Sequence, residues 1–251
     1  MKNRIAKVIV CCLTALLLFA AAGCFPMWIA RNGIVGNGVR DTREVTLEKT
    51  LSGIRSMSVI DIEFDPTLTD KIVLEGDENI LPLVTAEQGA DGVVTLSFEE
   101  QHNISLLSNV VARVPYIDGG LIETSSTGSV RMTDSTPLKG ERFTLRINST
   151  GGMNLVLEAD ELQISSMSTG SFRLSGSTKR AEIELGSTGS FEGFDLIAAD
   201  VKVSVMSTGS AQVYATNSLN ATIMSTGSVI YDGNPAQVSV EDSSIGKLRP
   251  R

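Results

Sequence analysis

The strongest constraint on this chain's fold is a tetrapeptide, Ser-Thr-Gly-Ser, that recurs through its second half. Complete copies begin at Ser126, Ser168, Ser187, Ser207 and Ser225, and degraded copies stand at residues 149–152 and 243–246. The glycines of these seven copies follow one another at spacings of 23, 19, 19, 20, 18 and 19 residues. A period this regular is the mark of a repeat architecture in which each repeat is one supersecondary unit.

Apolar and polar residues alternate on both sides of each tetrapeptide. Before one copy the apolar positions are Phe143, Leu145 and Ile147, and after another they are Phe172 and Leu174. Alternation at every second position predicts β-strands. Each repeat is therefore a strand, a bend at Thr-Gly, a second strand in a new phase and a short turn of small or polar residues.

The length of the repeat selects one architecture. About 19 residues are too few for the four strands of a propeller blade, and no repeat has the 3.6-residue period of a helix. One turn of a parallel β-solenoid has this length, with coils stacked about 4.8 Å apart and hydrogen-bonded to their neighbours. We predict an all-β chain: a single-stranded parallel β-helix (solenoid) with coils of about 19 residues and a strand-rich N-terminal section.

Stacked coils place equivalent residues in columns. The first serines continue the inward phase and are expected to form a buried or half-buried structural ladder whose hydroxyls bond to one another: Ser126, Ser149, Ser168, Ser187, Ser207 and Ser225. The next residues should face outward and form a candidate exposed binding column: Thr127, Thr150, Thr169, Thr188, Thr208 and Thr226. The bend glycines are expected to supply the dihedral angles that the bends need: Gly128, Gly151, Gly170, Gly189, Gly209 and Gly227.

The N-terminus has the layout of an export signal. Three basic residues precede an apolar run over residues 8–22, and Ala-Ala-Gly-Cys follows at residues 21–24. The run is shorter than the roughly 20 residues of a membrane-spanning helix. The last four residues are similar to a bacterial lipobox, so we predict a lipoprotein signal peptide over residues 1–23, lipidation at Cys24 and a tether over residues 24–35. The alternative is an ordinary secretory signal cut near Ala22.

The number of cysteines and the net charge exclude several kinds of site and partner. Two of the three cysteines lie inside the signal, so Cys24 alone would remain, and neither an intrachain disulfide nor a thiolate metal cluster is expected. Loss of residues 1–23 removes three positive charges and leaves 18 basic against 29 acidic residues. An acidic chain of this kind argues against a nucleic-acid partner and leaves the lipid as its link to the membrane.

The region before the repeats also has the character of strands. The best candidates are residues 56–64, 71–74, 93–98 and 110–114. We divide the domain into a strand-rich part over residues 36–115 and the repeat β-helix over residues 116–251. The strands of the first part are expected to be either early coils or a cap over the first coil.

Short motifs in a fixed order resemble a known family. They are Gly-Asn-Gly at 36–38, Leu-Ser-Gly-Ile at 51–54, the run from Lys71 to Pro82, Asp-Gly-Val-Val-Thr-Leu at 91–96 and Val-Pro at 114–115, followed by small-residue repeats. In this order they are similar to the "putative auto-transporter adhesin, head GIN domain" family. The resemblance implies an exported, often lipid-anchored β-helical protein, although a fold alone does not fix function.

Motifs for catalysis are missing from the sequence. The sole histidine, His102, lies in a polar stretch without a partner motif, no Gly-x-Ser-x-Gly elbow is present, and the repeated tetrapeptide lacks the lysine of a phosphate loop. The acidic residues, such as Glu158, Asp160 and Glu182, do not repeat from coil to coil. No calcium-binding nonapeptide occurs either. We therefore predict no enzyme activity, no cofactor and no metal.

These observations predict a non-enzymatic, lipid-anchored protein of the bacterial cell envelope, at the outer membrane or cell surface. Its rigid face would bind a surface, a glycan or a protein partner. One alternative is a carbohydrate-active enzyme, a lyase or glycosidase, on the same β-helix. The other is a structural or signalling accessory of the envelope.

Overall fold

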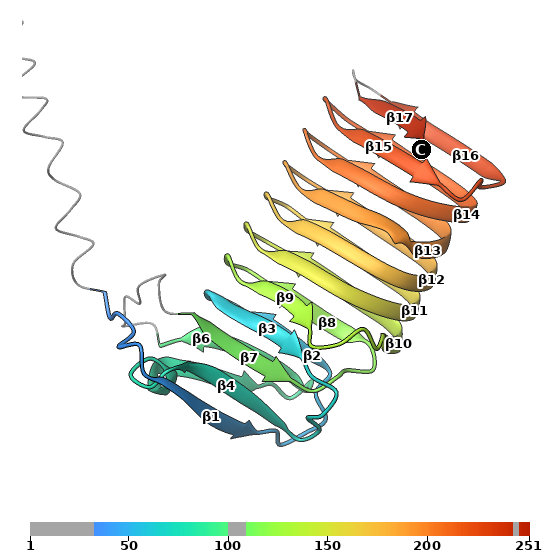
Figure 1. Cartoon of the computed structure of the whole chain (residues 1–251). Coiled ribbons are helices and arrows are strands. Elements are labelled where there is room, and N and C mark those ends of the chain that lie inside the picture. Colours follow the sequence, from blue (N-terminus) through green and yellow to red (C-terminus); the bar gives the residue numbers. More distant parts are fainter. Residues whose placement is uncertain (1–32, 100–108, 243–245) are drawn as a thin grey trace, which may run out of the picture.

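The computed structural model describes residues 33–99, 109–242 and 246–251. Within them the chain forms one seventeen-stranded sheet, wound into a rod with its N-terminal strands at one end (Figure 1). No helix among the described residues is long and apolar enough to cross a membrane. The predictions for residues 1–23, Cys24 and His102 lie outside the described residues.

The first half of the chain supplies short strands and one 3₁₀ turn. They are β1 (Arg40–Thr46), β2 (Gly53–Ser56), β3 (Ile60–Phe64), β4 (Lys71–Asp77), η2 (Leu81–Leu83), β5 (Val84–Gln88), β6 (Val93–Phe98) and β7 (Val110–Val114). The repeat region supplies β8 (Gly120–Thr124), β9 (Ser129–Met132), β10 (Leu138–Ile147), β11 (Gly152–Ser166), β12 (Ser171–Leu185), β13 (Ser190–Val205), β14 (Ser210–Ile223), β15 (Ser228–Asp232), β16 (Gln237–Asp242) and β17 (Lys247–Pro250).

Parallel pairing between successive coils confirms the predicted β-solenoid. One inward position can be followed through the whole stack: Ile122, Leu145, Ile164, Ile183, Val203, Ala221 and Val240. The steps are 23, 19, 19, 20, 18 and 19 residues, the same series as the glycine spacings in the sequence. The repeat length is therefore the length of one coil.

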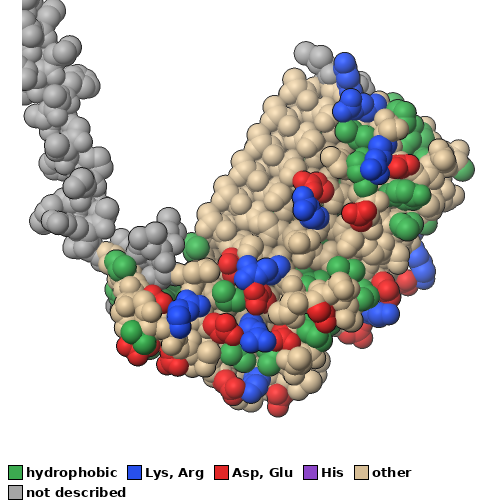
Figure 2. Space-filling model, in the orientation of Figure 1, with side chains coloured by type: hydrophobic (Ala, Val, Ile, Leu, Met, Phe, Trp, Pro, Cys, Tyr) green, Lys and Arg blue, Asp and Glu red, His purple; other side chains and the backbone are tan. Residues whose placement is uncertain are grey.

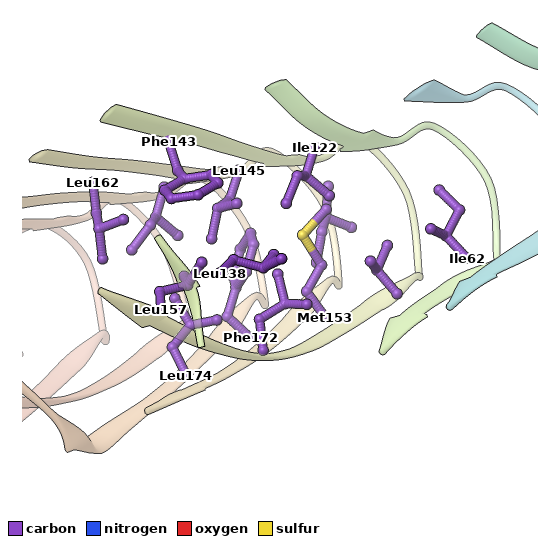
Figure 3. Packing of buried hydrophobic residues seen from close by; sticks show 14 of the residues in the cluster. Ile62, Ile122, Leu138, Phe143, Leu145, Met153, Leu157, Leu162, Phe172 and Leu174 are labelled. Carbon is purple, nitrogen blue, oxygen red and sulfur yellow. The ribbon is translucent and has the colours of Figure 1, made fainter. Parts of the chain in front are cut away.

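Alternating apolar side chains fill the interior of the rod. Strands β11 to β14 each run from one face around a corner to the other, so a single strand contributes side chains to both sides of the core. Phe143 and Leu145 point inward from one side and Met153 and Phe172 from the other, and all four are buried (Figure 3). Burying one such side chain stabilises the fold by roughly 1.5–3 kcal/mol.

The bend glycines are needed for a different reason from the one we predicted. None of them has a positive φ, so the expectation that they supply unusual dihedral angles is wrong. A Cβ on Gly151 would lie 2.6 Å from the carbonyl oxygen of Gly128, and one on Gly170 would lie 2.3 Å from Cγ2 of Ile147. Except at Gly189, where the nearest atom is the Ser166 hydroxyl at 3.1 Å, the bend glycines are therefore required because the bend approaches the neighbouring coil too closely for a side chain.

The N-terminal strands form both early coils and a cap. Strand β2 pairs in parallel with β6 and β8, and β3 pairs in parallel with β7 and β9. The coil made of β2 and β3 thus lies between two coils that come later in the chain. Beyond it, β4 runs antiparallel to β7 and β1, and β5 runs antiparallel to β6. These antiparallel strands continue the sheet at the N-terminal end of the rod.

One arginine ties the cap to the early coils. Arg113 on β7 forms ion pairs with Glu75 on β4, at 3.1 Å, and with Asp65, which follows β3. Asp65 is 2% exposed, and its Oδ1 accepts hydrogen bonds from the Thr67 hydroxyl (2.6 Å) and amide (2.8 Å). The Thr67 hydroxyl, with help from Arg113, holds the pKa of Asp65 below its ordinary value against the opposing effect of burial.

The tight stacking at the bends gives a first prediction. Replacing Gly170 with Ala should lower the free energy of unfolding by about 1–3 kcal/mol, since the new methyl group must displace Ile147 in a packed core. The matched control is Gly152→Ala, where the nearest atom to the new Cβ is the movable Ser171 hydroxyl at 3.3 Å. Urea denaturation measures both. Equal stability of the two variants would contradict this account of the bends.

A second prediction concerns acid stability. Because the pKa of Asp65 is lowered in the folded state, its stabilising effect is complete above the unfolded pKa of about 3.9 and is lost as the pH falls through the folded value. Asp65→Asn should therefore lower the free energy of unfolding at pH 7 by roughly 1.5–3 kcal/mol. The free energy of unfolding of this variant should also fall less steeply below pH 4 than that of the unaltered protein. Urea unfolding from pH 3 to pH 7 tests this. Parallel pH profiles for the two proteins would argue against it.

Candidate functional site

The strands that follow the bends form one broad polar face of the rod. In Figure 2, the side of the rod where β9 and β15 begin shows very few charged or apolar side chains, while positive and negative side chains stand together farther along the same face. The pattern arises because the small residues of the tetrapeptide recur in every coil. Four columns of equivalent residues, and one position where a column lacks its side chain, define the candidate site on and beside this face.

The predicted columns occupy the bends. All six threonines of the candidate binding column are exposed: Thr127, Thr150, Thr169, Thr188, Thr208 and Thr226. The first serines are half-buried at Ser126, Ser149, Ser168, Ser187 and Ser207, whereas Ser225 is exposed and has a φ of 67°. No hydrogen bond joins one of these serine hydroxyls to the next within the described residues. The expected hydroxyl chain does not form because coils about 4.8 Å apart exceed the reach of a hydroxyl hydrogen bond.

A second serine column, which the sequence reasoning missed, starts the outer face. It consists of the last residue of each tetrapeptide: Ser129, Ser171, Ser190, Ser210 and Ser228. Asp61 closes its first end, where Oδ1 accepts hydrogen bonds from the Ser129 amide (2.7 Å) and hydroxyl (2.9 Å). Lys247 pairs with Ser228 at the other end. Counting three residues beyond the first serine in the sequence would have found this column.

The backbone holds this serine column rigidly. The amides of Ser171, Ser190 and Ser210 donate to the carbonyl oxygens of bend glycines in the preceding coil, at 3.0–3.2 Å. Each hydroxyl is therefore fixed to a backbone that is itself bonded to its neighbours. The column needs little ordering when a partner binds, which lowers the entropic cost of association.

Two residues farther along each strand lies a charged column. It runs through Glu63, Arg131, Asn154, Arg173, Glu192 and Gln212. Arg131 Nε donates to Glu63 Oε1 at 2.6 Å, and Arg173 donates from Nε (2.8 Å) and Nη2 (2.6 Å) to Glu192 Oε2. Asn154 lies between the two ion pairs.

The column of last serines is interrupted at Gly152, where a shallow groove of about 310 Å³ opens. Gly152 is the one position of the serine column, among coils with a described residue there, that lacks a side chain. Ser129 and Ser171 line the groove along the column, and Arg131, Asn154 and Arg173 line it from the charged column. The sequence signal for this groove was the degraded tetrapeptide at residues 149–152.

Several acidic residues of the repeat region have cationic or polar partners. Glu158 pairs with Lys139, Asp160 with Lys179, Glu161 with Arg142 and Arg180, and Glu182 with Lys202. Hydrogen bonds from Ser218 and Asn217 lower the pKa of Asp200. No group of three or more His, Cys, Asp or Glu side chains suited to a metal ion occurs in the described part of the chain.

Comparison with known proteins agrees with this geometry. The model of the family described as "Putative auto-transporter adhesin, head GIN domain" matches residues 50–235. The chain belongs to this family. The match covers the early coils and most of the repeats, and the adhesin-like character of the head GIN domain assigns the chain to exported or cell-surface proteins. Among curated proteins, none matches the sequence.

Solved structures share the fold. A "putative adhesin" from Bacteroides fragilis is 22% identical, with a TM-score of 0.74 over 87% of this chain and 100% of its own. A "putative adhesin" from Parabacteroides distasonis is 20% identical, with a TM-score of 0.67 over 87% and 100%. A "putative lipid binding protein" from the same organism is 21% identical, with a TM-score of 0.68 over 87% and 99%. At these identities the likeness concerns the fold alone.

Proposed function

We propose that this chain is a lipid-anchored protein of the bacterial cell envelope that presents a rigid β-helical face for adhesion. The observation that carries the proposal is the regular polar face of the solenoid, on which hydroxyl columns extend from coil to coil. Membership of an adhesin-like family supports the same function.

The chemistry of this face suits many weak contacts with a repetitive partner. Each repeat coil offers an exposed threonine and, except at Gly152, a serine, about 4.8 Å from those of the next coil. Hydroxyl groups both donate and accept, so the face accommodates a surface glycan or a polar protein surface without demanding one orientation. Because the scaffold is rigid, little conformational entropy is lost when several contacts form together.

The paired acidic residues support a role without catalysis. A glycosidase needs two carboxyl groups flanking one bond, with one of them able to act as an acid. Four carboxylates of the repeat region instead form ion pairs with lysine or arginine: Glu158, Asp160, Glu161 and Glu182. An accessory role in the envelope remains the second candidate, favoured by the uniformity of the polar columns, which would also suit a permanent protein partner.

The anchor is part of the proposal and rests on the sequence. The motif that ends at Cys24, together with the short stretch before β1, would place the rod close to a membrane. A thioether-linked lipid with further acyl chains binds membranes stably where one chain alone is marginal. The outer membrane or the cell surface is the location that this proposal requires.

The threonine column gives the test of adhesion. Replacing Thr169, Thr188 and Thr208 together with Tyr should reduce attachment of the purified protein to envelope-bearing cells or to a glycan-coated surface at least tenfold, because bulky rings break the flat face. Thermal unfolding should change little, since all three side chains are exposed. The matched control replaces two other exposed residues with Tyr, Lys202 on β13 and Asn220 on β14, which lie on the strand segments before the bends. Unchanged attachment of the threonine variant would refute a binding role for this column.

The anchor is tested separately by intact-mass spectrometry of the protein purified from its native membrane. We expect a chain that begins at Cys24 and carries a diacyl or triacyl adduct, and a Cys24→Ser form that lacks the adduct and is recovered in the soluble fraction. A mass that corresponds to cleavage with a free thiol would disprove anchoring. That result would leave the adhesion test above unaffected.

A further inference from the structure

The groove around Gly152 is not a by-product of packing. A Cβ built on Gly152 meets only the movable Ser171 hydroxyl at 3.3 Å and its carbonyl oxygen at 3.8 Å, and the residue has no positive φ. The bend glycines differ, because a Cβ on Gly128 or Gly151 would meet backbone oxygen at 2.5 or 2.6 Å. The fold would therefore accept serine at position 152, as in the neighbouring coils, and the missing side chain leaves an opening.

The side chains around the opening offer alternating donors and acceptors. Arg131 and Arg173 line the opening one coil to either side of Asn154. Each arginine pairs with a glutamate one coil farther out, Arg131 with Glu63 and Arg173 with Glu192. Asn154 is exposed, and its amide has no hydrogen-bond partner among the described residues. Ser129 and Ser171 add hydroxyls at the edge of the groove. An amide flanked by guanidinium–carboxylate pairs can donate to and accept from adjacent hydroxyl groups of one ligand.

The charge balance favours an uncharged ligand. The two guanidinium groups face the carboxylates of Glu63 and Glu192, and Asp61 adds another carboxylate 3.7 Å from Arg131. An anion would have to compete with these carboxylates for the same donors. The volume of about 310 Å³ is at the lower end of the roughly 300–1,000 Å³ typical of ligand pockets. The groove therefore suits one small, uncharged, hydroxyl-rich group.

We propose that the Gly152 groove binds a neutral sugar unit of a surface glycan, with Asn154 as the central contact and the flanking ion pairs holding adjacent hydroxyls. The inference rests on the proposed adhesive function and names its ligand class and subsite. It also explains why the copy of the tetrapeptide at residues 149–152 has glycine in place of its last serine. The interruption places a specific contact within a face that is otherwise uniform.

The test uses the whole exported chain and saturation-transfer NMR with defined probes. The neutral probes are mannose, galactose, glucose, fucose and N-acetylglucosamine oligosaccharides, and the acidic probes are sialyllactose, oligogalacturonate and inorganic phosphate. We expect binding of at least one neutral probe with a millimolar Kd, and no tighter binding of any acidic probe. Gly152→Ser, which restores the repeat and should keep the fold, and Asn154→Ala should each weaken that binding at least tenfold.

The matched control is Gln212→Ala, because Gln212 is an amide at the same register position three coils farther along. This variant should bind the neutral probe as the unaltered chain does. Three results would overturn the proposal: no neutral probe bound, an acidic probe bound more tightly, or unchanged binding by Gly152→Ser. None of them bears on the threonine-column test, so loss of the subsite and loss of adhesion are distinguishable.

Discussion

Close stacking of the coils is the constraint on which the rest of this structure depends. Each bend comes near enough to the preceding coil that a Cβ on Gly128, Gly151 or Gly209 would lie within 2.8 Å of a carbonyl oxygen. That proximity permits the interstrand hydrogen bonds that satisfy the backbone on both sides of every internal coil. It also forces equivalent residues into straight columns, so the chemistry of one tetrapeptide becomes the chemistry of a whole face.

The two ends of the stack of coils differ in how they are covered. At the N-terminal end, the antiparallel strands β1, β4 and β5 continue the sheet, and Arg113 joins them to the early coils through Asp65 and Glu75. At the C-terminal end, Val238 and Val240 keep the inward register yet remain about half exposed. The rod therefore has a closed base and an end where charged residues of β17 discourage further pairing.

The proposed function depends both on the regular hydroxyl columns and on the one position, Gly152, where the serine column is interrupted. The uniform hydroxyl columns repeat one weak contact along the rod, whereas the single glycine in place of serine at position 152 exposes Asn154 between two ion pairs. Repetition gives many equivalent contacts, and an interruption gives a distinct one. The proposed sugar subsite follows from this difference between one coil and its neighbours.

The sequence alone determined the architecture of the repeats, because strand periodicity and glycine spacing directly encode which residues face inward and how long one coil is. It also located the Thr column, since stacking converts sequence position into spatial position. It did not reveal why the bends need glycine, because the clash is with a residue about 20 positions away. Nor did it reveal that β2 and β3 lie between later coils, or that Arg131 and Arg173 flank Asn154. Those arrangements depend on pairing between distant segments and on the conformations of long side chains, which only the tertiary structure decides.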